Sequence, residues 1–322
     1  MRYKSCHLIE HGISTCKDTI LACCLSRDFD KGMLPIEYKF ENNKIDWEHV
    51  FFVKRNHRTH QKNGRDLPSC EGCYNLREDD WDDEDYISYI NFDHWNLCNS
   101  NCIYCEVQTT KPKGKNTVLA AMRELIESGK YRNEGEITFQ GGEPTVLPEF
   151  DDLLNLFLKQ NSRIRIHSSG ILYKQSIHEG LKSGAVTVVI SPDAVSKDLY
   201  KTIKRVDKCH DVWENIKHYR QGLTGENEYL LKVKYIIIPG VNDILEEVTA
   251  FLNKIKEIDI KSIIVDVEFK YVSANVEDIS PHVYILTDYT EHFCNENGIS
   301  FDIYDSAKYA EMNRKYEKTT EN

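Results

Sequence analysis

The sequence lacks long apolar segments and lacks an excess of basic residues. No stretch of its 322 residues approaches the ~20 apolar residues that a membrane-spanning helix needs. The net charge is −11, and no stripe of lysine and arginine is present that would follow a phosphate backbone. We therefore expect no membrane partner and no nucleic-acid partner. The hydrophobic content of 40% still allows a sizeable core, in one large domain or one domain with a smaller attachment.

The first residues, MRYKSCHLIEHG, lack the apolar core of a signal peptide, so we expect a cytoplasmic protein. Cysteine, in contrast, is abundant, with 11 in the chain. In a reducing compartment, cysteines at short spacings indicate metal binding rather than disulfides. Cys209 and Cys294 stand alone in amphipathic helical contexts and are expected in the core. The other cysteines lie in the first third of the chain: Cys6, Cys16, Cys23, Cys24, Cys70, Cys73, Cys98, Cys102 and Cys105.

From residue 86 onward, strand-like and helix-like patterns alternate. Six strands are expected, at 86–92, 136–140, 163–169, 186–191, 229–238 and 261–269. Helices are expected between and after them, at 116–129, 147–160, 174–184, 198–205, 211–222 and 244–258. The first of these should begin at a cap formed by Asn116 or Thr117 and stop at Gly129. Such alternation predicts an α/β fold with a parallel sheet, and six units fit a partial, open (β/α)6 barrel.

The rest of the chain divides around this barrel. Residues 1–78 are expected to form a small cysteine-rich module, with short strands at 7–10 and 18–25 on either side of a turn at Gly12. Residues 55–68 are polar and are expected to form a loop. The acidic run at 79–85 predicts a solvated linker. The barrel then covers 86–275, and residues 276–322 form an extension with a helix at 281–298, a strand at 299–304 and a helix at 305–318.

The strongest motif is CNSNCIYC, in which Cys98, Cys102 and Cys105 share one short loop. Three thiolates at this spacing can bind three irons of a 4Fe–4S cubane and leave the fourth iron open for chemistry. Zinc, the alternative, usually takes four protein ligands in paired C-x2-C units. The loop resembles the cluster loop of the radical S-adenosylmethionine (SAM) superfamily. The resemblance implies that Tyr104, the aromatic residue before the last cysteine, packs near the adenine of SAM.

A second motif, GGEP, follows the second barrel strand and resembles the SAM-binding turn of the same family. Glycines allow backbone carbonyls to approach closely, and an ammonium group needs such acceptors. The resemblance implies that Gly141, Gly142 and Glu143 bind the amino group of SAM. Weaker matches at the ends of later strands add a cofactor-binding set: Ser169, Ser191, Asp193, Lys234 and Pro239. The serines also fit helix caps, and Arg205 or Lys232 are alternatives to Lys234 as the cation for the SAM carboxylate.

The resemblance implies the initiating chemistry. An electron from the reduced cluster breaks the S–C5′ bond of SAM, and the resulting 5′-deoxyadenosyl radical takes a hydrogen atom from a substrate. The electron is expected from a flavodoxin-type or ferredoxin-type donor. Asp266 and Glu268 lie at the end of the sixth strand, where barrel enzymes bind substrates, so either is a candidate base after hydrogen abstraction, although a surface role for one is also open.

The amino-terminal cysteines predict a second metal site. Cys6, Cys24, Cys70 and Cys73 could complete an auxiliary 4Fe–4S cluster without an open iron, with Cys16 or Cys23 as alternative ligands. The pattern resembles the SPASM and twitch auxiliary-cluster modules of this superfamily, which normally follow the barrel rather than precede it. A zinc site or the absence of metal stays open.

The sequence supports three hypotheses for the function of this protein. The first is a radical SAM oxidoreductase with one auxiliary cluster, acting on a sugar-like small molecule or on a peptide. The second is an activating enzyme that places a radical on a partner protein. The third is a non-catalytic iron–sulfur protein, against which the GGEP turn argues.

Overall fold

The computed structural model describes most of the chain: residues 2–16, 19–23, 44–65, 67, 70, 73, 75–105, 117–268 and 280–303. These residues fall into two compact units. The first comprises Met1–Leu97 with Thr110–Arg165, and the second comprises Cys98–Thr109 with Ile166–Asn322. The expected boundaries at residues 78, 85 and 275 are not those of the compact units, and as functional boundaries they stay predictions.

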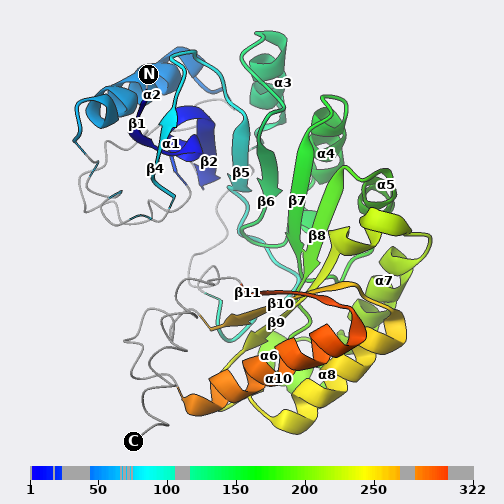
Figure 1. Cartoon of the computed structure of the whole chain (residues 1–322). Helices are drawn as coiled ribbons and strands as arrows, with labels where there is room; N and C mark the ends of the chain where they lie inside the picture. Colours follow the sequence, from blue (N-terminus) through cyan, green and yellow to red (C-terminus); the bar gives the residue numbers. More distant parts are fainter. Residues whose placement is uncertain are drawn as a thin grey trace, which may run out of the picture. The chain divides into compact units, whose positions relative to one another are not determined.

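The first unit contains the amino-terminal elements and the first two barrel strands (Figure 1). Along the chain these are β1 (Arg2–Ser5), α1 (His7–His11), β2 (Gly12–Cys16), β3 (Thr19–Leu21), α2 (Trp47–Lys62), β4 (Arg77–Asp80), β5 (Tyr89–Asp93), α3 (Leu119–Glu127), β6 (Glu136–Phe139) and α4 (Phe150–Leu158). Its strands follow the order β6-β5-β2-β3, and β1 pairs separately with β4. Strand β2 is parallel to β5 and antiparallel to β3, so the cysteine-rich segment extends the barrel sheet.

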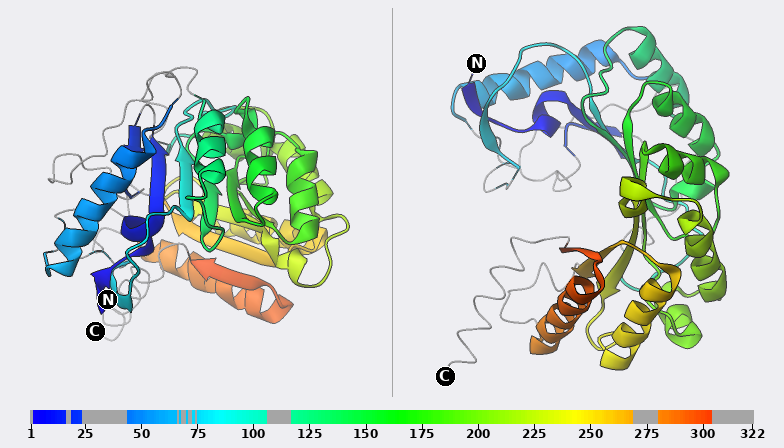
Figure 2. Two further views of the ribbon diagram at one scale, coloured as in Figure 1. Left: turned by 90° about the horizontal axis from the view of Figure 1, so that it is seen from above. Right: turned by 45° about the vertical axis from the view of Figure 1, so that its right-hand side comes forward.

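The second unit carries the later strands, with its helices along one side of them (Figure 2). The chain passes into this unit within β7 (Arg163–Ser168). There follow α5 (Gln175–Ser183), β8 (Val186–Ile190), α6 (Lys197–Lys204), α7 (Cys209–Arg220), β9 (Leu231–Ile237), α8 (Leu245–Ile258), β10 (Ser262–Val267), α10 (Pro281–Asn297) and β11 (Ser300–Ile303). The strand order is β11-β10-β9-β8-β7, and the pairs β8–β9, β9–β10 and β10–β11 are parallel.

These elements confirm the α/β class and all six expected barrel strands. Central strands alternate buried and partly exposed residues, as in β7 and β9, because one face packs against helices. In the first unit, the core between β5, β6 and α4 is aromatic. The rings of Phe92 and Phe139 lie 4.9 Å apart between centroids, and Phe157 packs 5.9 Å from Phe92. Such rings bury large apolar areas and fix the helix on the sheet.

Several local predictions were wrong. Residues 7–10 form helix α1 rather than a strand, because the Cys6 sulfur accepts the Ile9 N–H and caps the first turn. Gly12 begins β2 instead of making a turn. The polar segment from Arg55 belongs to α2, which continues to Lys62. Helix α3 begins after Val118 rather than at a cap from Thr117, and its first N–H groups are bound by a carboxylate from another element.

The acidic run does not lie free in solvent. Trp81 is buried, and its indole N–H donates to the carbonyl of Tyr3 at 2.9 Å. Asp85 forms an ion pair with the buried Arg58 of α2 at 2.5 Å. The run is thus packed along α2. The expected final helix at 305–318 and Asn116 lie outside the described residues.

Among the described residues, no helix is both long enough and apolar enough to cross a membrane.

Candidate functional site

The glycine turn after β6 is bound to the segment that leads into the cysteine loop. The Gly142 N–H donates to the carbonyl of Trp95 at 2.6 Å, and the Glu143 N–H donates to that of Leu97 at 2.8 Å. Leu97 immediately precedes Cys98 in the chain. The turn after β6 and the segment after β5 are therefore joined by backbone hydrogen bonds, as expected for the neighbouring ends of parallel strands.

Both glycines are required by this close approach. Gly141 has a φ of +98°, and a Cβ there would lie 2.6 Å from Asp93 Oδ1. A Cβ on Gly142 would lie 2.2 Å from the carbonyl oxygen of Leu97. Any side chain would therefore push the turn away from the loop segment. Glu143 is 1% exposed, and its Oε1 accepts hydrogen bonds from the N–H and the hydroxyl of Thr145 at 3.1 and 2.6 Å.

A buried histidine and glutamate support the same segment and were missed from the sequence. The Nδ1 of His94 lies 3.1 Å from the hydroxyl of Thr15, and its Nε2 lies 3.6 Å from Glu149. The Glu149 carboxylate also accepts the N–H groups of Val118 and Leu119 at 2.8 and 3.3 Å. Glu149 thus caps α3, in the place where a local cap was predicted.

The cysteine loop lies in the second unit and is held by the end of α6. The Asn101 N–H donates to the carbonyl of Lys204, and the Ile103 N–H donates to that of Ile203, both at 2.9 Å. These carbonyls belong to the last turn of a helix, where carbonyls have no partner within the helix. The loop thereby satisfies them, and its backbone is fixed at two alternate residues.

The thiols are arranged for a cluster. The Ser100 hydroxyl lies 3.3 Å from Cys98 Sγ and 3.5 Å from Cys102 Sγ, so both sulfurs face one small space. Cys98 is exposed, while Cys102 and Cys105 are partly buried. Among the described residues, no three histidine, cysteine or acidic side chains are grouped to hold a single metal ion. A cubane binds each thiolate to a different iron, and two sulfurs on either side of one hydroxyl are compatible with such a cluster.

Tyr104 does not project into open space; its hydroxyl is part of a buried network. It donates to Asp193 Oδ2 at 2.6 Å and accepts from Lys204 Nζ at 2.8 Å. Lys204 also pairs with the same carboxylate oxygen. Burial, and then the charge of Asp193, raises the pKa of Tyr104 well above its usual range. Asp193 is 0% exposed, and protein groups already bind its carboxylate. Its contact with SAM stays a prediction.

The structure gives the two predicted serines different contacts. Ser169 donates its hydroxyl to Asn99 Oδ1, inside the cysteine loop, at 3.0 Å. The same hydroxyl accepts the Ile171 N–H at 3.4 Å, in a local turn rather than at a helix cap, since α5 begins only at Gln175. The Ser191 N–H donates to the carbonyl of Ser168 at 3.3 Å.

The residues predicted after β9 and β10 partly come together. Lys234 and Asp266 form an ion pair at 2.7 Å, because they lie on neighbouring parallel strands. Glu268 is 7% exposed, and its N–H donates to the carbonyl of Ile237 at 2.9 Å. Pro239 is partly exposed in the turn that follows β9. The alternative cations lie elsewhere: Lys232 pairs with Asp302, and Arg205 is exposed.

The amino-terminal cysteines gather in the first unit. Cys6 and Cys70 are buried in one apolar cluster with Ile9 and Leu67. Burial, followed by the charges of Cys23 and Cys73, raises the pKa of Cys6, so these thiols lie within electrostatic reach of it. Cys24, the predicted fourth ligand, lies outside the described residues.

A buried lysine stands beside these thiols. Lys54 of α2 is 1% exposed, and its ammonium donates to the carbonyls of Leu8 and Ile9 at 3.0 and 2.9 Å. Burial, and then the charge of Arg58, lowers the pKa of Lys54 to about 7. Glu10, Cys6 and Cys23 act in the opposite direction. No pattern in the sequence had marked this residue.

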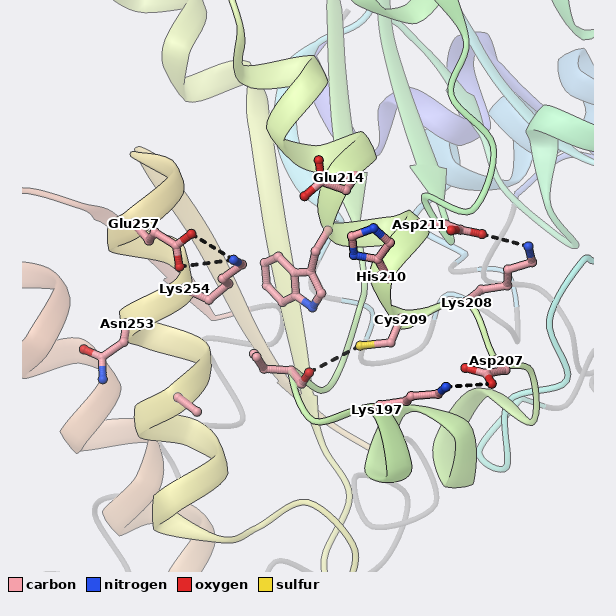
Figure 3. A pocket seen from close by; sticks show the side chains of 13 residues that line it. Lys197, Asp207, Lys208, Cys209, His210, Asp211, Glu214, Asn253, Lys254 and Glu257 are labelled. Carbon is pink, nitrogen blue, oxygen red and sulfur yellow. Dashed lines mark hydrogen bonds and ion pairs between the residues drawn. The ribbon is translucent and has the colours of Figure 1, made fainter.

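A pocket of about 690 Å³ lies on the helical side of the second unit, between α7 and α8 (Figure 3). Its lining mixes both charges, including Lys254 and Glu257, which form an ion pair along α8. The Cys209 thiol donates to the carbonyl of Val195 at 3.3 Å, and burial raises the pKa of that thiol to about 11. None of the predicted site residues lines this pocket.

Comparisons with known proteins found relatives that match about half of the chain. GTP 3′,8-cyclase of Clostridium botulinum is 28% identical over 177 residues, which cover 53% of each chain. A UPF0026 protein of Helicobacter pylori is 28% identical over 176 residues, 49% of this chain and 54% of that protein. The chain thus spans about half the length of the curated relatives it matches. Streptococcus suis SuiB bound to S-adenosylmethionine shares the fold, with a TM-score of 0.53, 16% identity and coverage of 79% of this chain and 55% of SuiB.

The family model described as "Radical SAM superfamily" matches residues 93–255. The match begins at the last residue of β5 and includes the cysteine loop, β6 and the glycine turn. Because it also covers half of the chain, this chain belongs to the Radical SAM superfamily.

Proposed function

We propose that this protein is a radical SAM enzyme that cleaves SAM reductively and takes a hydrogen atom from a bound substrate. Cys98, Cys102 and Cys105 would hold the 4Fe–4S cluster. When bound, the cluster supplies the electron that splits SAM into methionine and a 5′-deoxyadenosyl radical. The observation that carries the proposal is the pair of hydrogen bonds that join the glycine turn to residues 95–97, directly before the first cysteine.

The turn and the later strands would bind SAM itself. Carbonyls of Gly141 and Gly142, with the Glu143 carboxylate, would accept hydrogen bonds from the amino group of SAM. Lys234 would bind the SAM carboxylate only after exchanging its ion pair with Asp266. That exchange would release Asp266 to act as a base, with Glu268 as the second candidate. Ser169, Ser191, Asp193 and Pro239 complete the proposed cofactor-binding set.

The substrate we favour is a small molecule, sugar-like or related to a nucleotide, rather than a peptide. The curated relatives named GTP 3′,8-cyclase, at 28% identity, support a small substrate. A peptide is the second candidate, and the SuiB fold has been observed with its precursor peptide. A net two-electron oxidation would need a second redox group, which the amino-terminal cysteines could provide.

We propose an auxiliary iron–sulfur cluster at these cysteines. Cys6, Cys70 and Cys73 are retained from the sequence prediction, with Cys24 or Cys23 as the fourth ligand. Two observations support it: Cys6 and Cys70 share one buried cluster, and Cys23 and Cys73 act electrostatically on Cys6. Thiolates enclosed in this way fit a closed site with no open iron.

The test counts iron and 5′-deoxyadenosine after anaerobic reconstitution, with dithionite as the reductant. We expect about eight irons in the parent and about four in a Cys98/Cys102/Cys105→Ala variant, since each cubane holds four. The variant should form no 5′-deoxyadenosine, whereas a Cys209→Ala control should keep both iron and activity. If the triple variant retains all its iron, the central assignment is wrong. If the parent holds about four irons and the variant none, only the auxiliary cluster is excluded.

A further inference from the structure

Three side chains beneath the cysteine loop form a closed polar group: Tyr104, Asp193 and Lys204. Asp193 and Lys204 are 0% and 2% exposed. The Lys204 ammonium contacts the Asp193 carboxylate and donates to the Tyr104 hydroxyl at 2.8 Å. It also lies 5.2 Å from the centre of the Tyr104 ring. The three groups therefore satisfy one another without solvent.

This group is anchored to the sheet through Asp193. The residue has a φ of +58°, in the left-handed region that aspartate and asparagine adopt more readily than other non-glycine residues. Its Oδ1 accepts the Ile236 N–H of β9 at 3.0 Å, and its carbonyl accepts the amide of Asn242 at 2.9 Å. Hydrogen bonds from β9 and from the turn after it thus hold Asp193 in place.

Lys204 connects this anchor to the cysteine loop twice. Its backbone carbonyl accepts the Asn101 N–H at 2.9 Å, and its ammonium holds the hydroxyl of Tyr104, next to Cys105. Lys204 alone therefore binds both the backbone of the loop, at Asn101, and one of its side chains, Tyr104. Lys201, one turn earlier on α6, is exposed, whereas Lys204 is buried.

The ammonium also acts on the thiolates. Burial alone would lower the pKa of Lys204, but Asp193 and then the charges of Cys102 and Cys98 raise it above its usual value. By reciprocity, the positive charge stabilises negative charge on these two sulfurs. Reduction adds one negative charge to a cluster, so a nearby buried cation favours the reduced form.

We propose that Lys204 is a positioning residue that fixes the cysteine loop and raises the reduction potential of the cluster it holds, with Asp193 and Tyr104 keeping the ammonium in place. The inference rests on the proposed function, because it requires a cluster on Cys98, Cys102 and Cys105. It gives Asp193 a role beside the cluster in addition to its place in the proposed cofactor-binding set.

The test is a redox titration with dithionite and mediators, followed by electron paramagnetic resonance of the reduced cluster. It is done in a background that lacks Cys70 and Cys73, so that the SAM cluster gives the signal. Lys204→Met should lower the ratio of reduced to oxidised cluster at a fixed potential at least tenfold, which for one electron is ~59 mV. Asp193→Asn should shift it in the opposite direction, since a negative charge is lost. Lys201→Met should match the parent.

Equal potentials in the parent, Lys204→Met and Asp193→Asn would overturn the inference while leaving the proposed function intact. A parent without a cluster would instead overturn the proposed function. If Lys204→Met does not load iron, Asp193→Asn carries the potential test, and amide hydrogen exchange of apo-protein peptides covering residues 99–105 carries the positioning test. Faster exchange in Lys204→Met than in Lys201→Met is expected, and equal exchange would contradict the positioning role.

Discussion

The two cysteine regions of the molecule each contain a buried lysine, but the lysines are bound differently. Beside the amino-terminal cysteines, the Lys54 ammonium donates to two backbone carbonyls, those of Leu8 and Ile9. Beside the radical SAM loop, Lys204 contacts a carboxylate, Asp193, and a tyrosine hydroxyl. Carbonyls solvate an ammonium, whereas a carboxylate also neutralises it.

The pKa values follow this difference. Burial lowers the pKa of Lys54 to about 7, whereas Asp193 outweighs burial and raises the pKa of Lys204. The charge balance beside the loop is therefore complete within the protein. Beside the amino-terminal cysteines, burial outweighs the charges of Glu10, Cys6 and Cys23, so the charge of Lys54 is not balanced in the same way.

The thiols of the two cysteine regions also differ in their exposure to solvent. Cys6 and Cys70 are buried among apolar side chains, while Cys98 is exposed at the start of its loop. A closed set of thiols is typical of a structural or electron-transfer site, and an accessible one of a site that binds a substrate or cofactor.

The largest effect is expected from Gly142→Ala, which should abolish SAM cleavage at the radical SAM loop without affecting the amino-terminal cysteines. The new Cβ would meet the Leu97 carbonyl oxygen at 2.2 Å and the Asn96 carbonyl carbon at 2.8 Å, both backbone atoms that cannot rotate away. We expect at least a hundredfold loss of 5′-deoxyadenosine formation, or ~2.7 kcal/mol in transition-state free energy. Gly129→Ala, where a φ of +72° strains the backbone but a Cβ meets nothing within 4 Å, is the control for strain without a steric clash, and it should keep activity.

Iron at the amino-terminal cysteines should survive Gly142→Ala, because Cys6 and Cys70 pack in an apolar cluster with Ile9 and Leu67 that does not include the turn. Loss of all iron in this variant, with the fold intact by circular dichroism, would show that the two regions are not independent. Wild-type activity would show that the turn does not bind SAM.

The next effect concerns pH. The folded pKa of Lys54, about 7, lies below the unfolded value of ~10.4, so the unfolded chain binds more protons between these values. The free energy of unfolding should therefore rise with pH across that window, by ~1.4 kcal/mol per unit from this group, and show no such slope below pH 7. Lys54→Met removes the group and should remove this contribution.

Urea unfolding of reduced apo-protein at pH 7, 8 and 9 measures the contribution of Lys54 to the free energy of unfolding. This contribution is the difference between wild type and Lys54→Met. Taking the difference cancels the thiols, which also ionise in this window. Iron-loaded protein should show a smaller slope, because thiolate charge would raise the pKa of Lys54. Equal slopes in wild type and Lys54→Met apo-protein would contradict the charge imbalance on which the comparison depends.

The sequence predicted the barrel well and the polar interior poorly, for one physical reason. Apolar periodicity marked all six strands of the barrel and its helices. Helix α2 was missed in part because its buried face continues from Trp47, Val50 and Phe51 into polar residues: Lys54, His57, Arg58 and Gln61. Hydrophobic pattern cannot register a buried residue that is charged.

The same reason applies to the site. Cys98, Gly142 and their neighbours were found because the motifs have fixed spacings. Lys204 was missed, although it follows Tyr200 and Ile203 on the buried face of α6 at helical spacing. The carboxylate of Glu149 caps a helix 30 residues away in sequence, which no local cap signal can indicate. Partners that are distant in sequence become visible only in the folded chain.

A smaller effect is expected from Asp85→Asn, which tests the ion pair of Arg58 near the amino-terminal cysteines. Arg58, the second cation near Lys54, is 3% exposed and pairs with Asp85 at 2.5 Å. Removing the carboxylate leaves a buried guanidinium without its counter-charge, at a cost of ~3 kcal/mol in unfolding free energy. Asp79→Asn, on the exposed strand β4, is the matched control. A loss equal to that of the control would mean that water already screens the pair.

The smallest effect is expected from Lys208→Met, which tests whether burial decides the role of a lysine. Lys208 lies four residues after Lys204 and also pairs with a carboxylate, that of Asp211 at 2.7 Å. Both partners are exposed, so water and salt screen the pair. The melting temperature and the cluster potential of this variant should match those of the parent, in contrast to Lys204→Met. A potential shift as large as that of Lys204→Met would mean that charge near α6 acts without burial, and would remove the distinction between Lys204 and its exposed neighbours.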